Sequence, residues 1–312
     1  MNCAETTESC LPKALSAAAC FAVVAPAGPA RLDVQKAQQW FAERGYRSRL
    51  YPSVSASEGY LAGSDGQRLQ DLHDAFADPA IDAILCMRGG YGSMRLLDRL
   101  DLDLVRRHPK PFIGYSDVTA LHNVFNQHAG LVTFHGAMLN ADLLGAKLQP
   151  TESSLIAQLG GHVRRGDAIA HPAEFPLNCV VPGTATGRLL GGNLSMLGAT
   201  LGTTGELQCE GAILFIEDVN EPLYRVDRLL TQLRLAGKLE GLKGVLVGDF
   251  AGITVAALTP LLLEIFGPLG VPVLAGWRSG HCDPNVCLPL GARVLLDSEK
   301  QQLVLQQDLF AV

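Results

Sequence analysis

The chain has 312 residues, of which 48% are apolar, and its 25 basic and 31 acidic residues give a formal net charge of −6. Because single hydrophobic cores tend to divide above about 250–300 residues, this length favours two domains. The acidic balance and the scattered basic residues argue against a surface for nucleic acid or an anionic membrane.

The cysteines and the N-terminal segment indicate the cellular compartment of the protein. Eight cysteines are spread along the chain, a pattern typical of free, mostly buried thiols in a reducing compartment such as the cytoplasm. An apolar run at 14–25 ends in small residues, as signal peptides do, but Glu5 and Glu8 precede it and it breaks at Pro26. We therefore expect residues 1–19 to form an N-terminal tail that leads into the first strand.

The segment 20–146 alternates between strand and helix patterns. Apolar or alternating runs predict strands at 20–25, 46–51, 81–87 and 111–116. Helical spacing of apolar residues predicts helices at 33–44, 64–77, 93–100 and 118–127. Strands alternating with helices form right-handed βαβ units, so we expect an α/β domain with a doubly wound parallel sheet. Ligands bind such sheets at the carboxyl ends of the strands, where the loops 26–29, 88–92 and 114–117 fall.

The periodicity weakens over 147–186, where prolines and a glycine pair recur, so this stretch is predicted to be a crossover linker. A second domain, 187–312, follows. Its strands are predicted at 211–217, 242–247, 271–275, 289–296 and 302–305, with an amphipathic helix at 223–235. The apolar stretch 255–277 contains Glu264 and three prolines, which favours a short helix and a strand over a membrane span.

Ser116 lies in a sharp turn, Gly114-Tyr-Ser-Asp117, between the fourth predicted strand and the next helix. Such a turn presents a serine hydroxyl at the edge of the sheet, and the N–H groups of the next turn face the atom that it attacks. The serine is therefore a candidate nucleophile. A serine at a helix start is also a common N-cap, and this stretch alone leaves that alternative open.

The loop Arg88-Gly-Gly-Tyr-Gly92 follows the third predicted strand and matches neither of the common phosphate-loop patterns. Glycines let the backbone come close to a reacting atom, so the N–H of Gly89 or Gly90 is a candidate donor to a developing oxyanion. The alternative is a tight turn between strand and helix.

A serine nucleophile needs a base to take its proton, and the base needs a third group to orient it. Among the eight histidines, His281 follows an apolar strand in a glycine-flanked loop, and His135 is its main rival. Glu217, at the end of an apolar strand, is the first candidate for the orienting acid. Asp218 and Glu221 are its rivals, although either could cap the following helix instead. Such a site would lie in the cleft between the two domains.

Several segments in this order resemble the serine LD-carboxypeptidases, also called muramoyltetrapeptide carboxypeptidases. The segments are Val24-Ala-Pro-Ala-Gly28, Met87-Arg-Gly-Gly-Tyr-Gly92, Ile113-Gly-Tyr-Ser-Asp117, Thr133-Phe-His-Gly136, Leu190-Gly-Gly-Asn-Leu194, Phe215-Ile-Glu-Asp218, Gly280-His281 and Leu288-Pro-Leu-Gly291.

The resemblance implies a triad of Ser116 as nucleophile, His281 as general base and acid, and Glu217 as the acid that orients the imidazole. The N–H groups of Gly90 and Asp117 would form the oxyanion hole. It also implies a flavodoxin-like first domain, a smaller β-rich second domain and, commonly, a homodimer. We expect no cofactor and no metal.

The reaction implied by the resemblance is release of the terminal D-alanine from a muropeptide tetrapeptide during cell-wall recycling in the cytoplasm. The bond cut joins the L-centre of meso-diaminopimelate or lysine to the D-residue. A carboxypeptidase must also hold a free carboxylate, for which Arg88, Arg188 and Arg278 are candidates. Arg88, Gly89 and Tyr115 are the expected substrate contacts.

Four alternatives deserve comparison. A metallocarboxypeptidase would need a ligand set such as HExxH, which the chain lacks. An α/β-hydrolase wants glycine two residues after the serine, where this chain has Val118. A non-enzymatic binding module would explain the glycine loops but leaves the serine, acid and histidine as coincidence. Within the same family, the self-immunity peptidase that cleaves aminoacyl-nucleotide antibiotics would share the triad.

Overall fold

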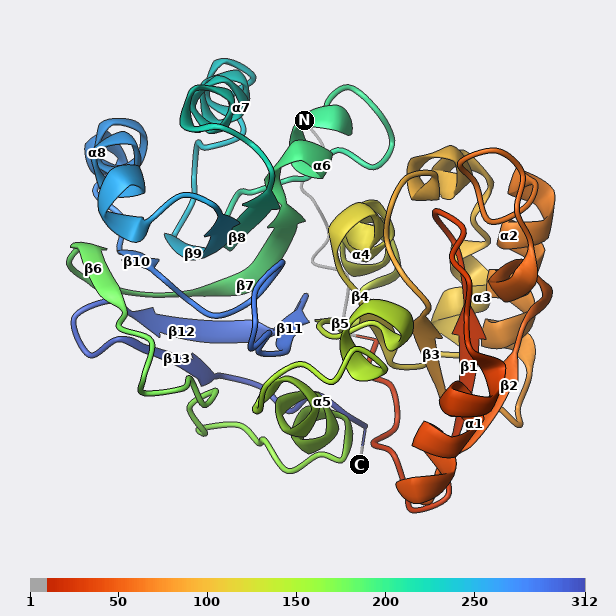
Figure 1. The fold of residues 1–312 in the computed structure, drawn as a ribbon. Coiled ribbons are helices and arrows are strands. Elements are labelled where there is room, and N and C mark those ends of the chain that lie inside the picture. Colours follow the sequence, from red (N-terminus) through yellow and green to blue (C-terminus); the bar gives the residue numbers. More distant parts are fainter. Residues whose placement is uncertain (1–9, 312) are drawn as a thin grey trace.

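The structure is a computed structural model that describes residues 10–311. The first nine residues of the expected N-terminal tail lie outside this range. The rest of the tail packs on the body of the protein, because the N–H of Cys10 donates to Gly130 O at 2.8 Å and that of Leu15 to Leu159 O at 2.8 Å. Figure 1 shows two halves, each built on one sheet, with α1, α2 and α3 outside one sheet and α7 and α8 outside the other.

The first sheet has six strands in the order β11-β5-β4-β3-β1-β2. The first five strands of the chain are parallel in the flavodoxin-like order 2-1-3-4-5, and β11 joins the edge antiparallel to β5. The strands are β1 (Cys20–Val24), β2 (Arg47–Leu50), β3 (Ala83–Cys86), β4 (Phe112–Gly114), β5 (Thr133–His135) and β11 (Leu288–Leu290). The expected doubly wound parallel sheet is confirmed.

Polar side chains cap the first helices of this half. Asp33 accepts a hydrogen bond from Lys36 N at the start of α1, and Ser64 accepts one from Gln67 N at the start of α2. The α-helices are α1 (Val34–Glu43), α2 (Asp65–Ala77), α3 (Leu102–Arg107), α4 (Thr119–Val124) and α5 (Thr151–Leu159). Shorter 3₁₀ and π-helical segments are η1 (Pro52–Ser55), η2 (Ser93–Arg99), η3 (Ser116–Val118), η4 (Phe125–Ala129) and η5 (Leu139–Leu143).

The second sheet has seven strands in the order β13-β12-β7-β8-β9-β10-β6. Strands β7 to β10 are parallel, and β6, β12 and β13 are antiparallel to their neighbours. The strands are β6 (Asn178–Val181), β7 (Thr184–Asn193), β8 (Ala212–Val219), β9 (Gly244–Ala251), β10 (Val273–Ala275), β12 (Arg293–Asp297) and β13 (Gln302–Leu305). The helices are α6 (Leu194–Ala199), α7 (Leu223–Leu235), α8 (Val255–Phe266) and the 3₁₀ turn η6 (Gly267–Leu269).

The strand expected at 289–296 is two strands in two different sheets. Gly291 separates β11 from β12 with a φ of +88°, a conformation that favours glycine. The prediction of one strand was wrong because an apolar run carries no sign of which sheet each part joins. The stretch 147–186, expected to be a linker, contains α5 and β6.

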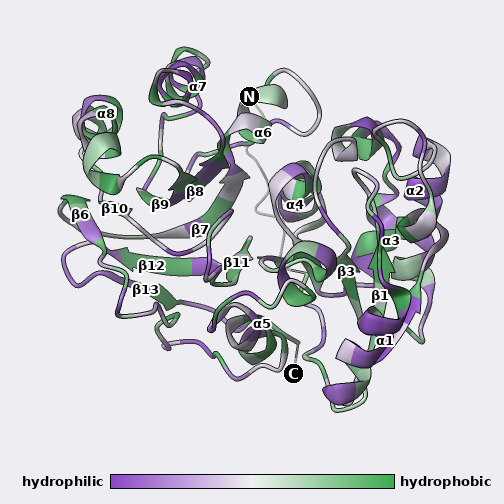
Figure 2. Ribbon diagram, viewed as in Figure 1, coloured by the Kyte–Doolittle hydropathy of each residue, from purple (hydrophilic) through white to green (hydrophobic). Residues whose placement is uncertain are grey.

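Buried apolar side chains of both halves meet in one cluster, which includes Phe21 and Phe134 from the first sheet and Phe215 from the second. The Phe134 ring stacks on Phe310 with the centroids 5.8 Å apart. In Figure 2 the interior strand β12 is mostly green, whereas the outer helix α7 shows much purple. This shared core fixes the position of the first sheet relative to the second. No helix within residues 10–311 is long and apolar enough to cross a bilayer.

Candidate active site

Ser116 begins η3 directly after β4 and has a φ of +67°, in the left-handed region that few residues other than glycine adopt. Strained backbone of this kind is concentrated at functional turns. Helix α4, which follows, lies between the two sheets and contacts β5 and β7. The serine hydroxyl is thereby directed toward the second half of the chain.

His281 joins Ser116, which follows β4, to Glu217 in β8. Its Nε2 lies 3.0 Å from Ser116 Oγ, and its Nδ1 lies 2.8 Å from Glu217 Oε2. The edge of the Tyr115 ring packs on the imidazole, with the centroids 5.0 Å apart. Burial lowers the pKa of His281, but the hydrogen bond and the charge of Glu217 outweigh it and raise that pKa above its ordinary value.

Glu217 lies on β8 and is fully buried. Its Oε2 also accepts a hydrogen bond from the backbone N–H of His281 at 3.3 Å. Burial raises the pKa of Glu217, yet His135 and His281 outweigh that effect and hold it at about 2. The acid is therefore a carboxylate at neutral pH.

Small residues make room for this carboxylate. Gly280 has a φ of +113°, and a Cβ atom at that position would collide with Glu217 Oε2. A Cβ atom on Gly248 would lie 3.1 Å from Glu217 Cβ. The motif Gly280-His281 therefore needs its glycine because the carboxylate occupies the space of a side chain.

The structure separates Glu217 from the rival acids. Asp218 binds the start of α6, because its carboxylate accepts hydrogen bonds from the backbone N–H of Ser195 at 2.9 Å and from Asn193 Nδ2 at 2.9 Å. Glu221 pairs with Arg225 at 3.4 Å. Neither makes a hydrogen bond or ion pair with His281 among the described residues. The rival histidine, His135, is buried on the other side of Glu217 and faces its Oε1 at 3.8 Å.

The glycine loop lies against the serine. Gly28 N donates to Gly89 O at 3.2 Å, which fixes the loop after β3 to the loop after β1. Gly90 has a φ of +112°, a conformation that favours glycine. The loop also lies near the backbone N–H of Asp117, whose nitrogen is 3.5 Å from the position that a Cβ atom on Gly89 would take. The Asp117 side chain accepts a hydrogen bond from Ser93 N at 2.8 Å, so its carboxylate holds η2.

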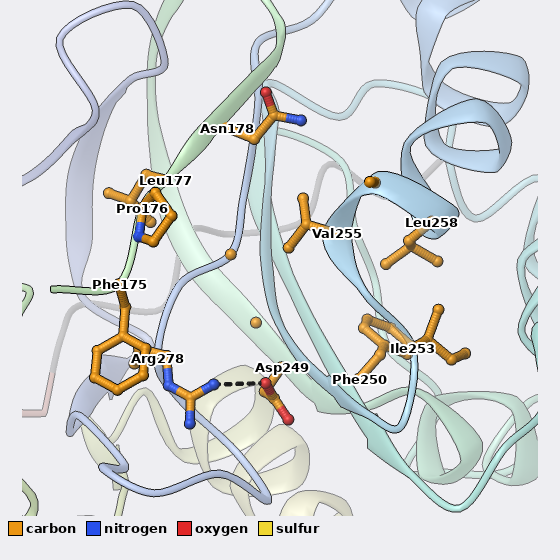
Figure 3. A pocket seen from close by; sticks show the side chains of 13 residues that line it. Phe175, Pro176, Leu177, Asn178, Asp249, Phe250, Ile253, Val255, Leu258 and Arg278 are labelled. Atoms are coloured by element: carbon orange, nitrogen blue, oxygen red, sulfur yellow. Dashed lines mark hydrogen bonds and ion pairs between the residues drawn. The ribbon is translucent and has the colours of Figure 1, made fainter.

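Two of the three candidate arginines are held by other groups. Arg188 donates to the carbonyl oxygens of Asn126 at 2.6 Å and Gly291 at 3.2 Å. Arg278 pairs with Asp249 at 2.8 Å. Figure 3 shows this ion pair at one end of a mostly apolar pocket of about 480 Å³ between the segment 175–178 and the start of α8. Of the residues expected at the site, only Arg278 lines that pocket.

Arg88 differs from them. One nitrogen, Nη1, donates to Pro29 O at 2.9 Å, while Nη2 lies 3.5 Å from the position that a Cβ atom on Gly90 would take. The guanidinium group therefore lies beside the glycine loop.

Tyr115 is only 4% exposed, and its hydroxyl donates to Asp142 Oδ1 at 3.1 Å. Burial and the charge of Asp142 raise the pKa of Tyr115 far above its ordinary value. Lys147 neutralises Asp142 at 2.6 Å and donates to Cys282 O at 2.9 Å, beside His281. Neither Asp142 nor Lys147 was predicted from the sequence. The one signal that could have pointed to them is that Asp142 is an isolated acid in the apolar stretch after His135.

Within residues 10–311, no group of three or more His, Cys, Asp or Glu side chains could hold a metal ion. The hydrogen bonds from Ser116 to His281 and from His281 to Glu217 support the chemistry of a serine activated by an imidazole, with a buried carboxylate behind it.

The chain is similar to known proteins over most of its length. Residues 21–136 match the family model described as LD-carboxypeptidase N-terminal domain, and residues 186–296 match that of the LD-carboxypeptidase C-terminal domain. A probable murein peptide carboxypeptidase of Bacillus subtilis is 39% identical over 95% of this chain and 94% of its own. A murein tetrapeptide carboxypeptidase of Pseudomonas aeruginosa is 35% identical over 89% of this chain and 93% of its own.

Solved structures share the whole fold. A MccF-like protein from Bacillus anthracis superposes with a TM-score of 0.87 at 27% identity, covering 95% of this chain and 99% of its own. A muramoyltetrapeptide carboxypeptidase from Oxalobacter formigenes gives 0.78 at 28% identity, covering 91% of this chain and 97% of its own. The expected two-part α/β fold and the expected type of enzyme are confirmed. The chain belongs to the LD-carboxypeptidase family.

Proposed function

We propose that this protein is a serine carboxypeptidase that removes the terminal D-alanine from muropeptide tetrapeptides. The bond hydrolysed links the L-centre of meso-diaminopimelate or lysine to the D-residue. The observation that carries the proposal is the hydrogen-bonded series Ser116–His281–Glu217, at 3.0 and 2.8 Å, in a chain 35–39% identical to proteins named murein carboxypeptidases.

The proposed mechanism begins with attack of Ser116 Oγ on the carbonyl carbon of the scissile bond, while His281 Nε2 takes the hydroxyl proton. Glu217 stabilises the imidazolium that forms. The negative charge on the tetrahedral intermediate is met by the N–H groups of Gly90 and Asp117. His281 then gives its proton to the departing amine of D-alanine, which leaves an acyl-enzyme.

Water completes the reaction. His281 takes a proton from a water molecule, whose oxygen attacks the acyl carbon, and the second tetrahedral intermediate collapses to release the tripeptide and restore Ser116. Glu217 stays ionised throughout, because its pKa of about 2 keeps the proton on the imidazole.

Arg88 is the arginine that we assign to the free carboxylate of the terminal D-alanine. One hydrogen bond, to Pro29 O, holds Arg88, and its Nη2 lies beside the glycine loop. Arg188 is instead bound by two backbone carbonyls, and Arg278 is paired with Asp249. A guanidinium group suits a carboxylate because it can donate two parallel hydrogen bonds. Gly89 lets the substrate backbone approach the serine, and Tyr115 contributes through its packing on His281.

The same-family alternative is an amidase that cleaves aminoacyl-nucleotide antibiotics. Solved structures of the microcin C7 self immunity protein MccF superpose with TM-scores of 0.85–0.86, but at 23–24% identity they support the fold alone. The sequence relatives at 35–39% identity favour the murein substrate. We also propose that the protein acts as a homodimer in the cytoplasm, as the family resemblance implies.

Mass spectrometry of a muramyl tetrapeptide incubated with wild type and with Ser116→Ala tests the proposal. Release of D-alanine by wild type alone is expected. Release by both proteins would mean that another residue is the nucleophile. No release by wild type, together with cleavage of an aminoacyl-sulfamoyl nucleoside, would favour the amidase instead.

A further inference from the structure

The Glu217 oxygen that does not bind His281 faces a second imidazole, that of His135, in the core. Glu217 Oε1 and His135 Nε2 are 3.8 Å apart, both residues are fully buried, and within residues 10–311 neither atom has a hydrogen-bond partner. A buried carboxylate oxygen without a donor costs free energy, as does a buried N–H without an acceptor. His135 Nε2 can supply the donor that Glu217 Oε1 lacks, and Glu217 Oε1 can supply the acceptor.

The other nitrogen of His135 has a partner that is compatible with a proton on Nε2. Its Nδ1 lies 3.4 Å from Ser279 Oγ, on the residue that precedes Gly280-His281. A hydroxyl that donates to Nδ1 leaves the ring proton on Nε2, which points at Glu217. With its proton on Nε2, His135 is a hydrogen-bond donor to the carboxylate.

The surroundings of His135 offer its Nε2–H no competing acceptor. Its ring packs against Phe215 at 4.9 Å, Tyr115 at 5.7 Å and His122 at 6.3 Å between centroids. Of these neighbours, Tyr115 stays protonated because its pKa is raised, and burial lowers the pKa of His122 to about 3, so both are neutral. Among residues 10–311, the charged side chain in contact with Nε2 is that of Glu217.

We propose that His135 is a positioning residue that donates its Nε2–H to Glu217 Oε1, so that one carboxylate is held between two imidazoles and its Oε2 stays aligned with His281. This inference rests on the proposed triad and adds a fourth member behind it. The donated hydrogen bond completes the hydrogen bonding of the carboxylate, whose negative charge stabilises the imidazolium that forms at His281.

A pair of amide substitutions separates donation from packing. His135→Gln places an amide N–H about where Nε2 lies, whereas the shorter His135→Asn carries the same group and falls short of Glu217. We expect His135→Asn to lower kcat about ten- to hundredfold with little change in KM, and His135→Gln to restore most of the loss. Tm values of the two variants control for folding, and if His135→Asn does not fold, His135→Phe removes the donor and keeps a ring.

The pH profile gives a readout that lost packing would not move. Without a donor on Oε1, more negative charge is left on the carboxylate, so His281 holds its proton more tightly. The acid limb of kcat/KM should therefore move to higher pH in His135→Asn and stay at its wild-type position in His135→Gln.

A serine-directed fluorophosphonate tests the same point without the peptide substrate. Ser116 Oγ attacks phosphorus, fluoride leaves, and His281 takes the hydroxyl proton, so the labelling rate reports on the triad. Slow labelling of His135→Asn and near-normal labelling of His135→Gln are expected. Equal loss in both variants, or wild-type rates and pH profile in a folded His135→Asn, would overturn the donor role.

The two proposals fail differently. Wild type that is labelled at Ser116 but releases no D-alanine contradicts the proposed substrate, and the labelling rates still decide the role of His135. Wild type that is not labelled at Ser116 overturns the triad and the role of His135 together.

Discussion

Gly89 lies so close to Ser116 that a Cβ atom on residue 89 would stand 2.9 Å from the serine Cβ and 3.0 Å from its Oγ. The serine can adopt its position only because residue 89 has no side chain. Because the two residues follow β3 and β4, which are adjacent parallel strands, neither can move away without disturbing the sheet.

Gly89→Ala should displace the serine hydroxyl and lower kcat/KM about a hundredfold, since a misplacement of about 1 Å costs that much. Gly66→Ala is the matched control, because a Cβ on Gly66, in α2, meets only Ser64 Oγ at 3.9 Å. Steady-state kinetics of both variants check this. Unchanged activity in Gly89→Ala would show that the loop yields and does not position the serine.

Replacing Ser116 should separate catalysis from backbone strain. Both Ser116→Ala and Ser116→Gly remove the hydroxyl and should be inactive. The glycine variant should have a free energy of unfolding about 1 kcal/mol larger than the alanine variant, because residue 116 has a φ of +67°. Urea unfolding of the two variants measures the difference, and equal stabilities would argue against strain at this turn.

Glu217→Gln should reduce kcat less than Ser116→Ala does, because the neutral amide still contacts His281 but cannot stabilise its positive charge. Rapid-quench or steady-state rates for both variants give the comparison. A larger loss for Glu217→Gln than for Ser116→Ala would contradict its role as the orienting acid.

The stability of the protein should depend on the ionisation of Glu217. Its folded pKa of about 2 lies below the ordinary 4.5, so its contribution is present above pH 4.5 and is lost as the pH falls toward 2. The stability advantage of wild type over Glu217→Gln should therefore shrink over that range. Urea unfolding of both proteins at several pH values tests this, and a difference independent of pH would mean that the folded pKa is not lowered.

The raised pKa of His281 acts in the opposite direction. The stability that it contributes is fully present below its ordinary pKa of 6.5 and is lost as the pH rises through the folded value. The pair Glu217–His281 should therefore stabilise the fold most between about pH 4.5 and 6.5. Wild type compared with His281→Gln should show its largest stability difference in that window.

Arg88→Ala should raise KM about ten- to hundredfold for a tetrapeptide with a free terminal carboxylate, because a charged hydrogen bond is lost. The same peptide with a C-terminal amide is the control, and its KM should be equal in wild type and variant. Equal effects on both peptides would assign the carboxylate to another group.

Much of the fold could be predicted because it depends on local patterns. Buried strands such as β1 and β3 are continuous apolar runs, Ser64 caps α2, and the amphipathic helix predicted at 223–235 is α7. Strand β5 was not predicted, because two of its three residues, Thr133 and His135, are polar and it makes no apolar run. The split between β11 and β12 was not predicted, because an apolar run does not show which sheet each part joins.

The sequence by itself determined the alternating α/β order, the sharp turn at Ser116, the glycine loop before it and, through ordered motifs, the family. Only the tertiary structure decided which acid and which histidine meet the serine, because Ser116 and His281 are 165 residues apart and come together only when both halves pack on a shared core. It also decided that Arg188 and Arg278 are bound by other groups and that His135 faces Glu217. Contacts of this kind depend on where strand ends meet in space, which no local pattern records.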